Sequence, residues 1–179
     1  MAPKWGQVRV GLWRKRLSDS PGDPTALFQV FNEIGIIEQL SRTLLEARLP
    51  KGLIAPHFSV LNHLIRVADG RTPVELARAF QVPKTSMTHT VSGLQKHGLV
   101  QVRPNPNDGR SKCVWITEAG RTLRDRTIAD LEPDFQQLVA GMDLERVLGI
   151  LPVLTDMRVF LDAHRNAEGP RDREFRNAR

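Results

Sequence analysis

The chain has 179 residues, enough for one domain with a full core and appended arms, and too few for two ordinary enzyme domains. Its only cysteine excludes an intramolecular disulfide and a four-cysteine zinc site, and no apolar run approaches the roughly 20 residues that cross a bilayer. The net charge of +6 is concentrated in residues 71–117, with seven basic and two acidic side chains, whereas residues 118–164 carry five basic and nine acidic ones. We therefore expect a soluble, cytoplasmic protein with a basic module that faces a polyanion.

Helix-forming patterns begin after an N-terminal arm. Residues 1–24 combine proline, glycine, serine and basic residues around two tryptophans without a helical period, so the order of this basic arm stays open. Asp23-Pro24 predicts a helix start, and apolar residues then recur at three- and four-residue intervals until Pro50-Lys51-Gly52. A second predicted helix runs from about Pro56 to a stop at Gly70.

The next segment predicts two short helices joined by a tight break. Thr72-Pro73-Val74-Glu75 combines a threonine cap, a proline in the first turn and a glutamate three residues after the cap, which predicts a helix as far as Phe80. Gln81-Val82-Pro83 ends that helix, and a new one is predicted from about Lys84 to just before Gly98. Two short helices with such a break are the helix-turn-helix pattern.

A β-hairpin and two longer helices are predicted downstream. Residues 99–103 have the pattern of a short strand, residues 104–111 that of a turn, and residues 112–117 that of the return strand. Helices are then predicted over residues 121–140 and 143–163, with kinks at their internal prolines.

The predicted fold is mainly α with a small β-hairpin: a winged helix-turn-helix lobe embedded between long helices. A single domain would cover residues 25–164, with the lobe at residues 56–117 and the long helices at residues 25–55 and 118–164. The apolar stripes of the long helices fit both an intramolecular core and a dimer interface, because so small a lobe cannot cover them. Residues 165–179 are polar and arginine-rich, which predicts a disordered tail.

The helix predicted from Lys84 has two distinct faces. On a helical wheel, Met87, Val91 and Leu94 lie on one side. The other side has no acidic residue and carries side chains that exchange hydrogen bonds with bases and phosphates, which favours a reading helix over an ordinary solvated surface. The polar side consists of Thr85, Thr88, His89, Ser92 and Lys96.

The hairpin carries a second signal at its tip. Asp108-Gly109 is a strong turn pair, and Asn105-Pro106-Asn107 before it supports a loop that projects from the body. Arg110 follows the tip, where a guanidinium would enter a minor groove, and we expect Asp108 to hold it by a charged hydrogen bond. The alternative is an ordinary surface loop with one nearby arginine.

The segment LQKHGLVQVRPNPNDGRSKCVWITEAG, residues 94–120, resembles the end of the recognition helix, the wing and the following Thr-x-x-Gly of the multiple-antibiotic-resistance regulator (MarR) family. Helices in the expected order extend the resemblance over residues 25–163. The resemblance implies a homodimer, formed by the first and last two helices, that binds double-stranded DNA at a pseudo-palindromic operator. Two recognition helices would enter successive major grooves, and two wings the flanking minor grooves.

Individual contacts follow from the same resemblance. Ser86, Thr88 and His89 correspond to contact positions of the recognition helix, and Asp108 and Arg110 to the pair in the wing. Gly109 stands where many members have a basic residue, and His89 stands where many have an arginine. We therefore expect recognition to depend on Arg110 and on DNA shape. The full predicted DNA-binding set is Lys84, Thr85, Ser86, Thr88, His89, Ser92, Lys96, Arg103, Asp108, Arg110 and Lys112.

The function predicted in this way is that of a DNA-binding transcriptional repressor that a small aromatic effector releases from DNA. A winged-helix module that binds proteins is the alternative. An enzyme has little support, because the sequence shows no nucleophile–base constellation and no phosphate-binding glycine loop. We expect no cofactor and no metal, since the histidine spacings place no two ligands on one helical face.

Two further residues have alternative interpretations. Cys113 lies in the predicted return strand and is either a packed structural thiol or the sensor of a redox-responsive regulator. His57 lies on the second predicted helix, close to where the family binds small aromatic effectors. It is either an effector-binding residue or a partly exposed histidine of no special role.

Overall fold

The structure is a computed structural model that describes residues 24–167. The basic arm and the disordered tail predicted at the two ends lie almost entirely outside these residues. The chain divides into two compact units, and the boundary along the chain falls between Leu131 and Glu132. The single domain predicted over residues 25–164 thus extends over parts of both units.

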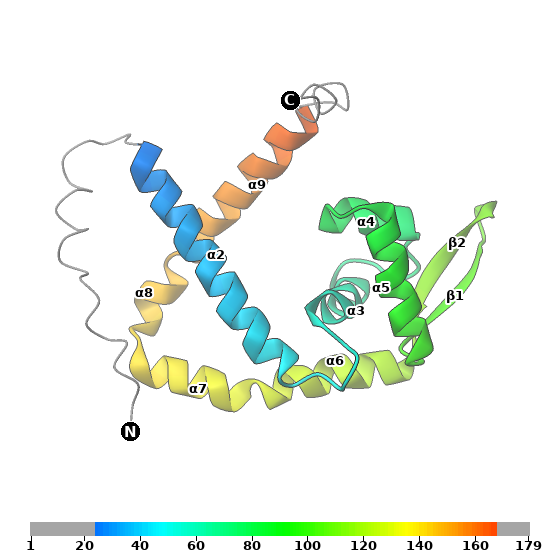
Figure 1. The fold of residues 1–179 in the computed structure, drawn as a ribbon, viewed down its shortest axis with the longest axis horizontal. Helices are drawn as coiled ribbons and strands as arrows, with labels where there is room; N and C mark the ends of the chain where they lie inside the picture. The colour runs from blue at the N-terminus through cyan, green and yellow to red at the C-terminus, as the bar shows by residue number, and fades with distance from the viewer. Residues whose placement is uncertain (1–23, 168–179) are drawn as a thin grey trace. The chain divides into compact units, whose positions relative to one another are not determined.

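The first unit contains five helices and a β-hairpin in its described part (Figure 1). They are α2 (Pro24–Glu46), α3 (Ala55–Arg66), α4 (Pro73–Phe80), α5 (Lys84–Lys96), β1 (Val100–Asn105), β2 (Asp108–Ile116) and α6 (Glu118–Asp130). The second unit contains α7 (Glu132–Gly141), α8 (Leu144–Leu148) and α9 (Leu151–Ala167). This confirms the predicted mainly helical fold with a small hairpin.

Local capping interactions explain where the helices of the lobe begin and end. The Thr72 hydroxyl accepts a hydrogen bond from the Glu75 backbone N–H at 3.2 Å, and Glu75 Oε2 accepts one from the Thr72 N–H at 2.7 Å. This reciprocal pair satisfies two amides that the first turn of α4 leaves without helical partners. Gln81 then adopts a left-handed conformation, with φ of 57°, and ends α4 before the new start at Lys84.

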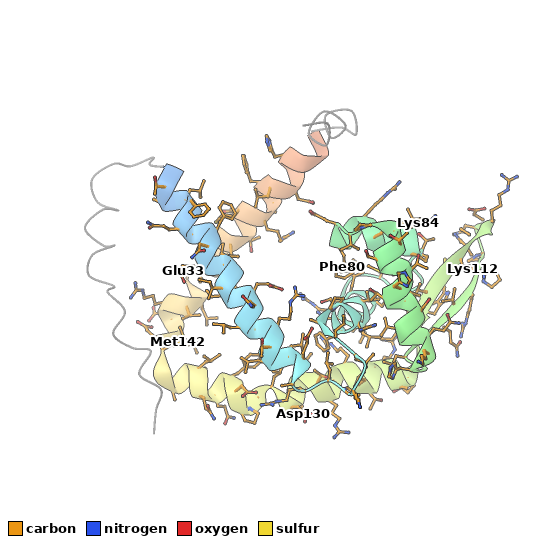
Figure 2. The ribbon with its side chains drawn as sticks, in the orientation of Figure 1. Glu33, Phe80, Lys84, Lys112, Asp130 and Met142 are labelled. Atoms are coloured by element: carbon orange, nitrogen blue, oxygen red, sulfur yellow. The ribbon has the colours of Figure 1, made fainter. Side chains whose placement is uncertain are left out.

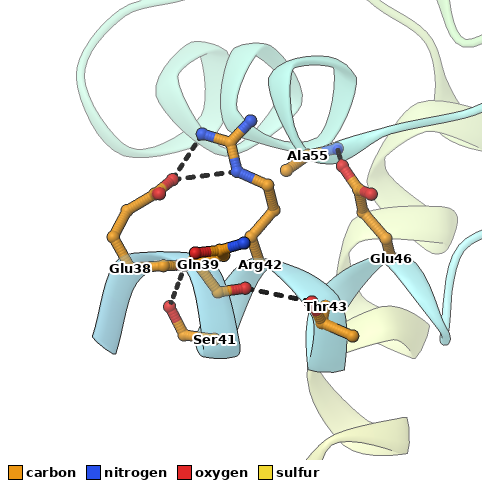
Figure 3. Close-up of polar contacts among 7 residues, drawn as sticks. All are labelled: Glu38, Gln39, Ser41, Arg42, Thr43, Glu46 and Ala55. Atoms are coloured by element: carbon orange, nitrogen blue, oxygen red, sulfur yellow. Dashed lines mark hydrogen bonds and ion pairs between the residues drawn. The ribbon is translucent and has the colours of Figure 1, made fainter. Parts of the chain in front are cut away.

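The connection from α2 to α3 is also held by a side chain. Glu46 Oε1, at the end of α2, accepts a hydrogen bond from the backbone N–H of Ala55 at 2.9 Å (Figure 3). One turn earlier, Arg42 forms an exposed ion pair with Glu38 on the same helix (Figure 3). The first contact joins two elements, whereas the second supports α2 alone and adds little stability.

Two continuous helices are predicted after the hairpin, and this prediction is wrong because each of them is interrupted. The segment predicted as one helix over residues 121–140 is divided at Leu131 into α6 and α7, and the segment over residues 143–163 is divided around Gly149 and Ile150 into α8 and α9. A proline follows each break, at Pro133 and Pro152. A proline inside a helix removes one backbone hydrogen bond and clashes with the preceding turn, but it is tolerated in the first turn of a new helix.

The predicted turn of the hairpin is too long. Residues 104–111 were expected to form it, but β1 continues to Asn105 and β2 begins at Asp108, so only Pro106 and Asn107 lie between the strands. Pro104 pairs with Lys112 within the ladder, and the register shifts immediately after it. Proline has no backbone N–H to donate. It is tolerated at this position because each strand of a two-stranded hairpin is an edge strand, which has a hydrogen-bonding partner on one side only.

The hydrophobic core lies in the lobe, between α3, α4, α5 and the base of the hairpin. Leu61, Leu64, Leu76, Leu94 and Val114 have no more than 1 % of their surface exposed. By contrast, no side chain described in the second unit is fully buried. The lobe therefore has a complete core of its own, whereas the remaining helices expose many apolar side chains.

Candidate nucleic-acid interface

Helix α5 is fixed in the lobe by its apolar side. Met87, Val91 and Leu94 are buried, with 3 %, 5 % and 0 % of their surface exposed. The opposite side is exposed at every position that the helical wheel assigned to it, namely Thr85, Thr88, His89, Ser92 and Lys96. The two predicted faces are thereby confirmed, while their contacts with DNA stay a prediction.

The first turns of α5 present both donors and acceptors. The Thr88 hydroxyl donates to the Lys84 carbonyl at 2.8 Å, and the Thr90 hydroxyl donates to the Ser86 carbonyl at 3.1 Å. The hydroxyl proton of Thr88 is thus used, and its oxygen remains available as an acceptor. Lys84 and Ser86 are exposed at the start of the helix (Lys84 is labelled in Figure 2).

The tip of the hairpin is ordered by its own side chains. The Asn105 amide donates to the Ser111 hydroxyl across the strands at 2.8 Å, and Asn105 Oδ1 accepts from the Asn107 N–H at 3.0 Å. Asp108 Oδ1 accepts from the backbone N–H of Arg110 at 3.0 Å. The predicted bond from Asp108 to the Arg110 guanidinium is therefore wrong: the carboxylate shapes the turn, because its nearest donor is a backbone amide two residues away.

The cationic side chains of the hairpin differ in their surroundings. Arg110 is exposed and forms no ion pair with any residue in the described range. Arg103 donates from Nε at 3.2 Å and from Nη2 at 2.6 Å to Gln101 Oε1 on the same strand. Lys112, labelled on the hairpin in Figure 2, is exposed opposite Pro104. Because cross-strand partners share a face of a hairpin, Lys112 and Arg103 project from opposite faces.

Cys113 is the cross-strand partner of Arg103, and only 4 % of its surface is exposed. A buried thiol is poorly accessible to an oxidant in solution. The surroundings of Cys113 therefore favour the packed structural thiol of the two interpretations.

His57 is buried at the junction of α3 and α5. Its Nδ1 accepts a hydrogen bond from the Ile54 backbone N–H at 3.0 Å, next to the start of α3. Burial lowers the pKa of His57 below its ordinary value of 6.5, and the nearby His97 lowers it further. Its ring thus contributes to the fold, and its predicted role in effector binding stays untested.

Sequence reasoning missed the residues that hold the base of the hairpin. Asp69 contacts β2 and α6, and Arg71 forms an isolated bridge with Val114. From the sequence, Gly70 predicts only the end of a helix, and Asp69 carries no prediction. No local sequence pattern marks these contacts, because the partners of Asp69 lie 47 and 52 positions away along the chain.

Residues 24–167 contain neither a candidate metal site nor a candidate membrane-spanning helix. No group of three or more histidine, cysteine, aspartate or glutamate side chains is placed so that it would hold a metal ion. No helix in this range is long and apolar enough to cross a membrane.

The lobe has the architecture of a winged helix-turn-helix protein. Residues 51–111 match a family model described as the MarR family. The apo crystal structure of MarR from E. coli is 29 % identical and matches with a TM-score of 0.60 over 70 % of this chain and 94 % of that chain. A mutant of that E. coli protein in complex with operator DNA is 27 % identical, with a TM-score of 0.63 over 76 % of this chain and 99 % of that one.

A third solved structure is that of Bordetella bronchiseptica BpsR, a protein whose DNA binding is regulated by 6-hydroxynicotinic acid. It is 22 % identical, with a TM-score of 0.61 over 73 % of this chain and 98 % of that chain, and thus supports the fold. The family model and the structural matches thus show that the chain is similar to MarR-family proteins and shares their winged helix-turn-helix fold, as the resemblance of residues 94–120 implied.

Proposed function

We propose that this protein is a transcriptional regulator that binds double-stranded DNA as a homodimer, with α5 in the major groove and the hairpin in the adjacent minor groove. The observation that carries the proposal is the exposed, acid-free face of α5 in the same folded lobe as the exposed Arg110, which forms no ion pair within residues 24–167. Such a surface offers hydrogen bonds to base edges and a cation to the narrow, electronegative groove. The E. coli relative solved with operator DNA supports the same choice of ligand.

Exposed apolar side chains support the homodimer. In α2, the exposed fractions are 71 % for Phe28, 60 % for Ile37 and 62 % for Leu40. In α9, Val153 is 58 % and Phe160 68 % exposed. Soluble monomers rarely expose so many large apolar side chains, so a second copy is the partner that would cover them. Two copies related by a two-fold axis would read a pseudo-palindromic operator.

We further propose that the protein represses transcription by occupying a promoter, and that a small aromatic molecule releases it. Supporting this is the relative whose DNA binding is regulated by 6-hydroxynicotinic acid. Release requires that the effector favours a dimer whose two reading helices no longer match successive major grooves. The first probe is therefore 6-hydroxynicotinic acid, titrated into the preformed complex while DNA binding is followed by fluorescence anisotropy.

The decisive experiment compares binding to the promoter of the protein's own gene with binding to random duplexes, at several salt concentrations. We expect a preferred fragment and an affinity that falls steeply with salt. Arg110→Ala should weaken binding by about 1 to 3 kcal/mol, and the matched control Arg126→Ala, on exposed α6, should not. Equal affinity for every promoter fragment and for random duplexes would overturn the proposal.

A further inference from the structure

The connection between α3 and α4 runs along the base of the hairpin, where Arg71 forms an isolated β-bridge with Val114. Asp69 Oδ1 accepts a hydrogen bond from the Ile116 backbone N–H at 3.0 Å, and the Arg71 carbonyl accepts one from the Val114 N–H at 2.8 Å. Between them, Gly70 faces the Trp115 ring so closely that a Cβ would lie 2.6 Å from it. Successive residues of this connection therefore contact successive residues of β2.

Asp69 also joins this connection to α6. Its second oxygen, Oδ2, pairs with Arg121 Nη2 at 3.2 Å, while Oδ1 additionally accepts from the Gly70 N–H at 3.0 Å. The carboxylate is only 25 % exposed, and it satisfies donors from the connection, from β2 and from α6. A charged acceptor makes stronger hydrogen bonds than a neutral one, so the junction is stiffer than an ordinary turn.

Fixing the base of the hairpin determines where its tip lies. Ile116 and Asp108 are the two ends of β2, eight residues apart, a length of roughly 26 Å at about 3.3 Å per residue. A tilt of about 10° at Ile116 would therefore move the tip by about 4 to 5 Å, more than a hydrogen bond or an ion pair tolerates. The contact between Arg110 and a groove thus depends on the angle at the base.

We propose that Asp69 is a positioning residue for the wing, which sets the angle at which Arg110 reaches DNA without touching DNA itself. The proposal rests on the proposed DNA-binding function. The rest of the lobe does not need Asp69 in order to fold, because Val100, Val114 and Ile116 anchor the hairpin in the hydrophobic core. Loss of the carboxylate should therefore loosen the angle of the wing and leave the lobe folded.

The test is a double-mutant cycle on the full-length protein, with affinity for the DNA fragment that the wild type prefers as the readout. Asp69→Asn keeps an oxygen acceptor for the backbone but loses the pair with Arg121. It should weaken binding by roughly five- to tenfold. The control Asp125→Asn removes an exposed carboxylate that pairs with Arg124, and it should change affinity by less than about twofold. Thermal unfolding of each variant verifies that the protein is folded.

The cycle separates positioning from a general loss of structure. If Asp69 acts through the wing, Arg110→Ala should weaken the Asp69→Asn variant much less than it weakens the wild type. Ser86→Ala, on α5, should instead have the same effect in both backgrounds, because α5 is held by its own buried face. Full additivity of Asp69→Asn and Arg110→Ala would overturn the positioning role while the DNA-binding proposal stands.

Arg121→Ala is the second variant, which decides the question if Asp69→Asn does not fold. It removes the ion pair but leaves the bond from Ile116 to Asp69, so we expect a smaller loss of affinity, again less than additive with Arg110→Ala. Full additivity of Arg121→Ala would overturn the proposal. If Arg110→Ala alone leaves affinity unchanged, the proposed contact of the wing with DNA is wrong, and the positioning role of Asp69 is overturned with it.

Discussion

The imidazole of His57 occupies the space that a side chain at Gly93 would need. A Cβ at Gly93 would overlap Nε2 of His57 and lie 3.2 Å from its Cδ2. On the other side of the ring, Nδ1 accepts the hydrogen bond from the Ile54 N–H. One histidine thus supports the start of α3 and sets the distance between α3 and α5, the helix proposed to read DNA.

Gly93→Ala should destabilise the lobe. The added methyl group gains helix propensity in α5 but must displace a buried ring, so we expect a net loss of about 1 to 2 kcal/mol in the free energy of unfolding. Urea denaturation followed by circular dichroism measures it. Gly35→Ala is the matched control, because a Cβ at this exposed position of α2 meets nothing within 4 Å and should be neutral or stabilising. If Gly93→Ala is as stable as that control, α3 and α5 move apart without any loss in the free energy of unfolding.

The stability of the lobe should fall as the pH is lowered from 7.5 to 5.5. Burial lowers the pKa of both His57 and His63 below the ordinary 6.5, so the unfolded chain binds more protons than the folded chain just below that pH. The stabilisation is therefore present above pH 6.5 and is lost as the pH falls toward the lowered pKa values. The pKa of Glu75 is also lowered, chiefly by hydrogen bonds from Thr72, but its contribution is lost only below about pH 4.5.

Urea denaturation at pH 7.5, 6.5 and 5.5 tests this dependence. His57→Gln, whose amide oxygen replaces the Nδ1 acceptor, should reduce the change in unfolding free energy between pH 7.5 and 5.5. His89→Gln, at an exposed position of α5, should leave the change as it is in the wild type. If the stability of His57→Gln depends on pH as strongly as that of the wild type, His57 is not a source of the pH dependence.

Thr72→Ala should destabilise the lobe by about 1 kcal/mol, because the Glu75 N–H loses its acceptor at the start of α4. The measurement is again the free energy of unfolding. Thr122→Ala, an exposed position within α6, serves as control and should be neutral or slightly stabilising. Equal effects of the two substitutions would mean that the cap does not determine where α4 begins.

Lys84→Ala and Thr88→Val should affect DNA binding in different ways. Lys84 is proposed to neutralise a phosphate, so its loss should weaken binding to all duplexes alike and reduce the slope of log affinity against log salt by about 1. Thr88→Val keeps the shape of the side chain and removes the hydroxyl oxygen, so affinity should fall for the preferred fragment alone. If Lys84→Ala instead weakens binding to the preferred fragment alone, and Thr88→Val weakens binding to all duplexes alike, the two residues have the opposite roles.

Ile37→Glu should convert the protein into a monomer of 20.2 kDa in sedimentation equilibrium, because a charge cannot be buried without a partner in an apolar interface. Binding to a two-site operator should be lost at the same time. Gln39→Glu introduces the same charge two residues away, at a position that is already polar and exposed, and should remain dimeric. A wild type that sediments as a monomer would remove the basis for the dimer.

The sequence alone determined the lobe and its two-faced helix. The apolar positions Met87, Val91 and Leu94 share one side of a helix whatever surrounds it, and Thr72 with Glu75 defines a helix start from neighbouring residues only. Both features arise from interactions within a few residues of the chain, which is why patterns and spacing sufficed to predict them.

Only the tertiary structure decided the contacts between residues far apart in the chain. Asp69 meets Ile116 and Arg121 across 47 and 52 positions, and His57 meets Gly93, because α3 packs against the hairpin, α6 and α5. No local pattern encodes which backbone amide lies opposite a given carboxylate. The sequence placed Arg110 in the wing, but packing at Asp69 decided the angle at which the wing leaves the lobe.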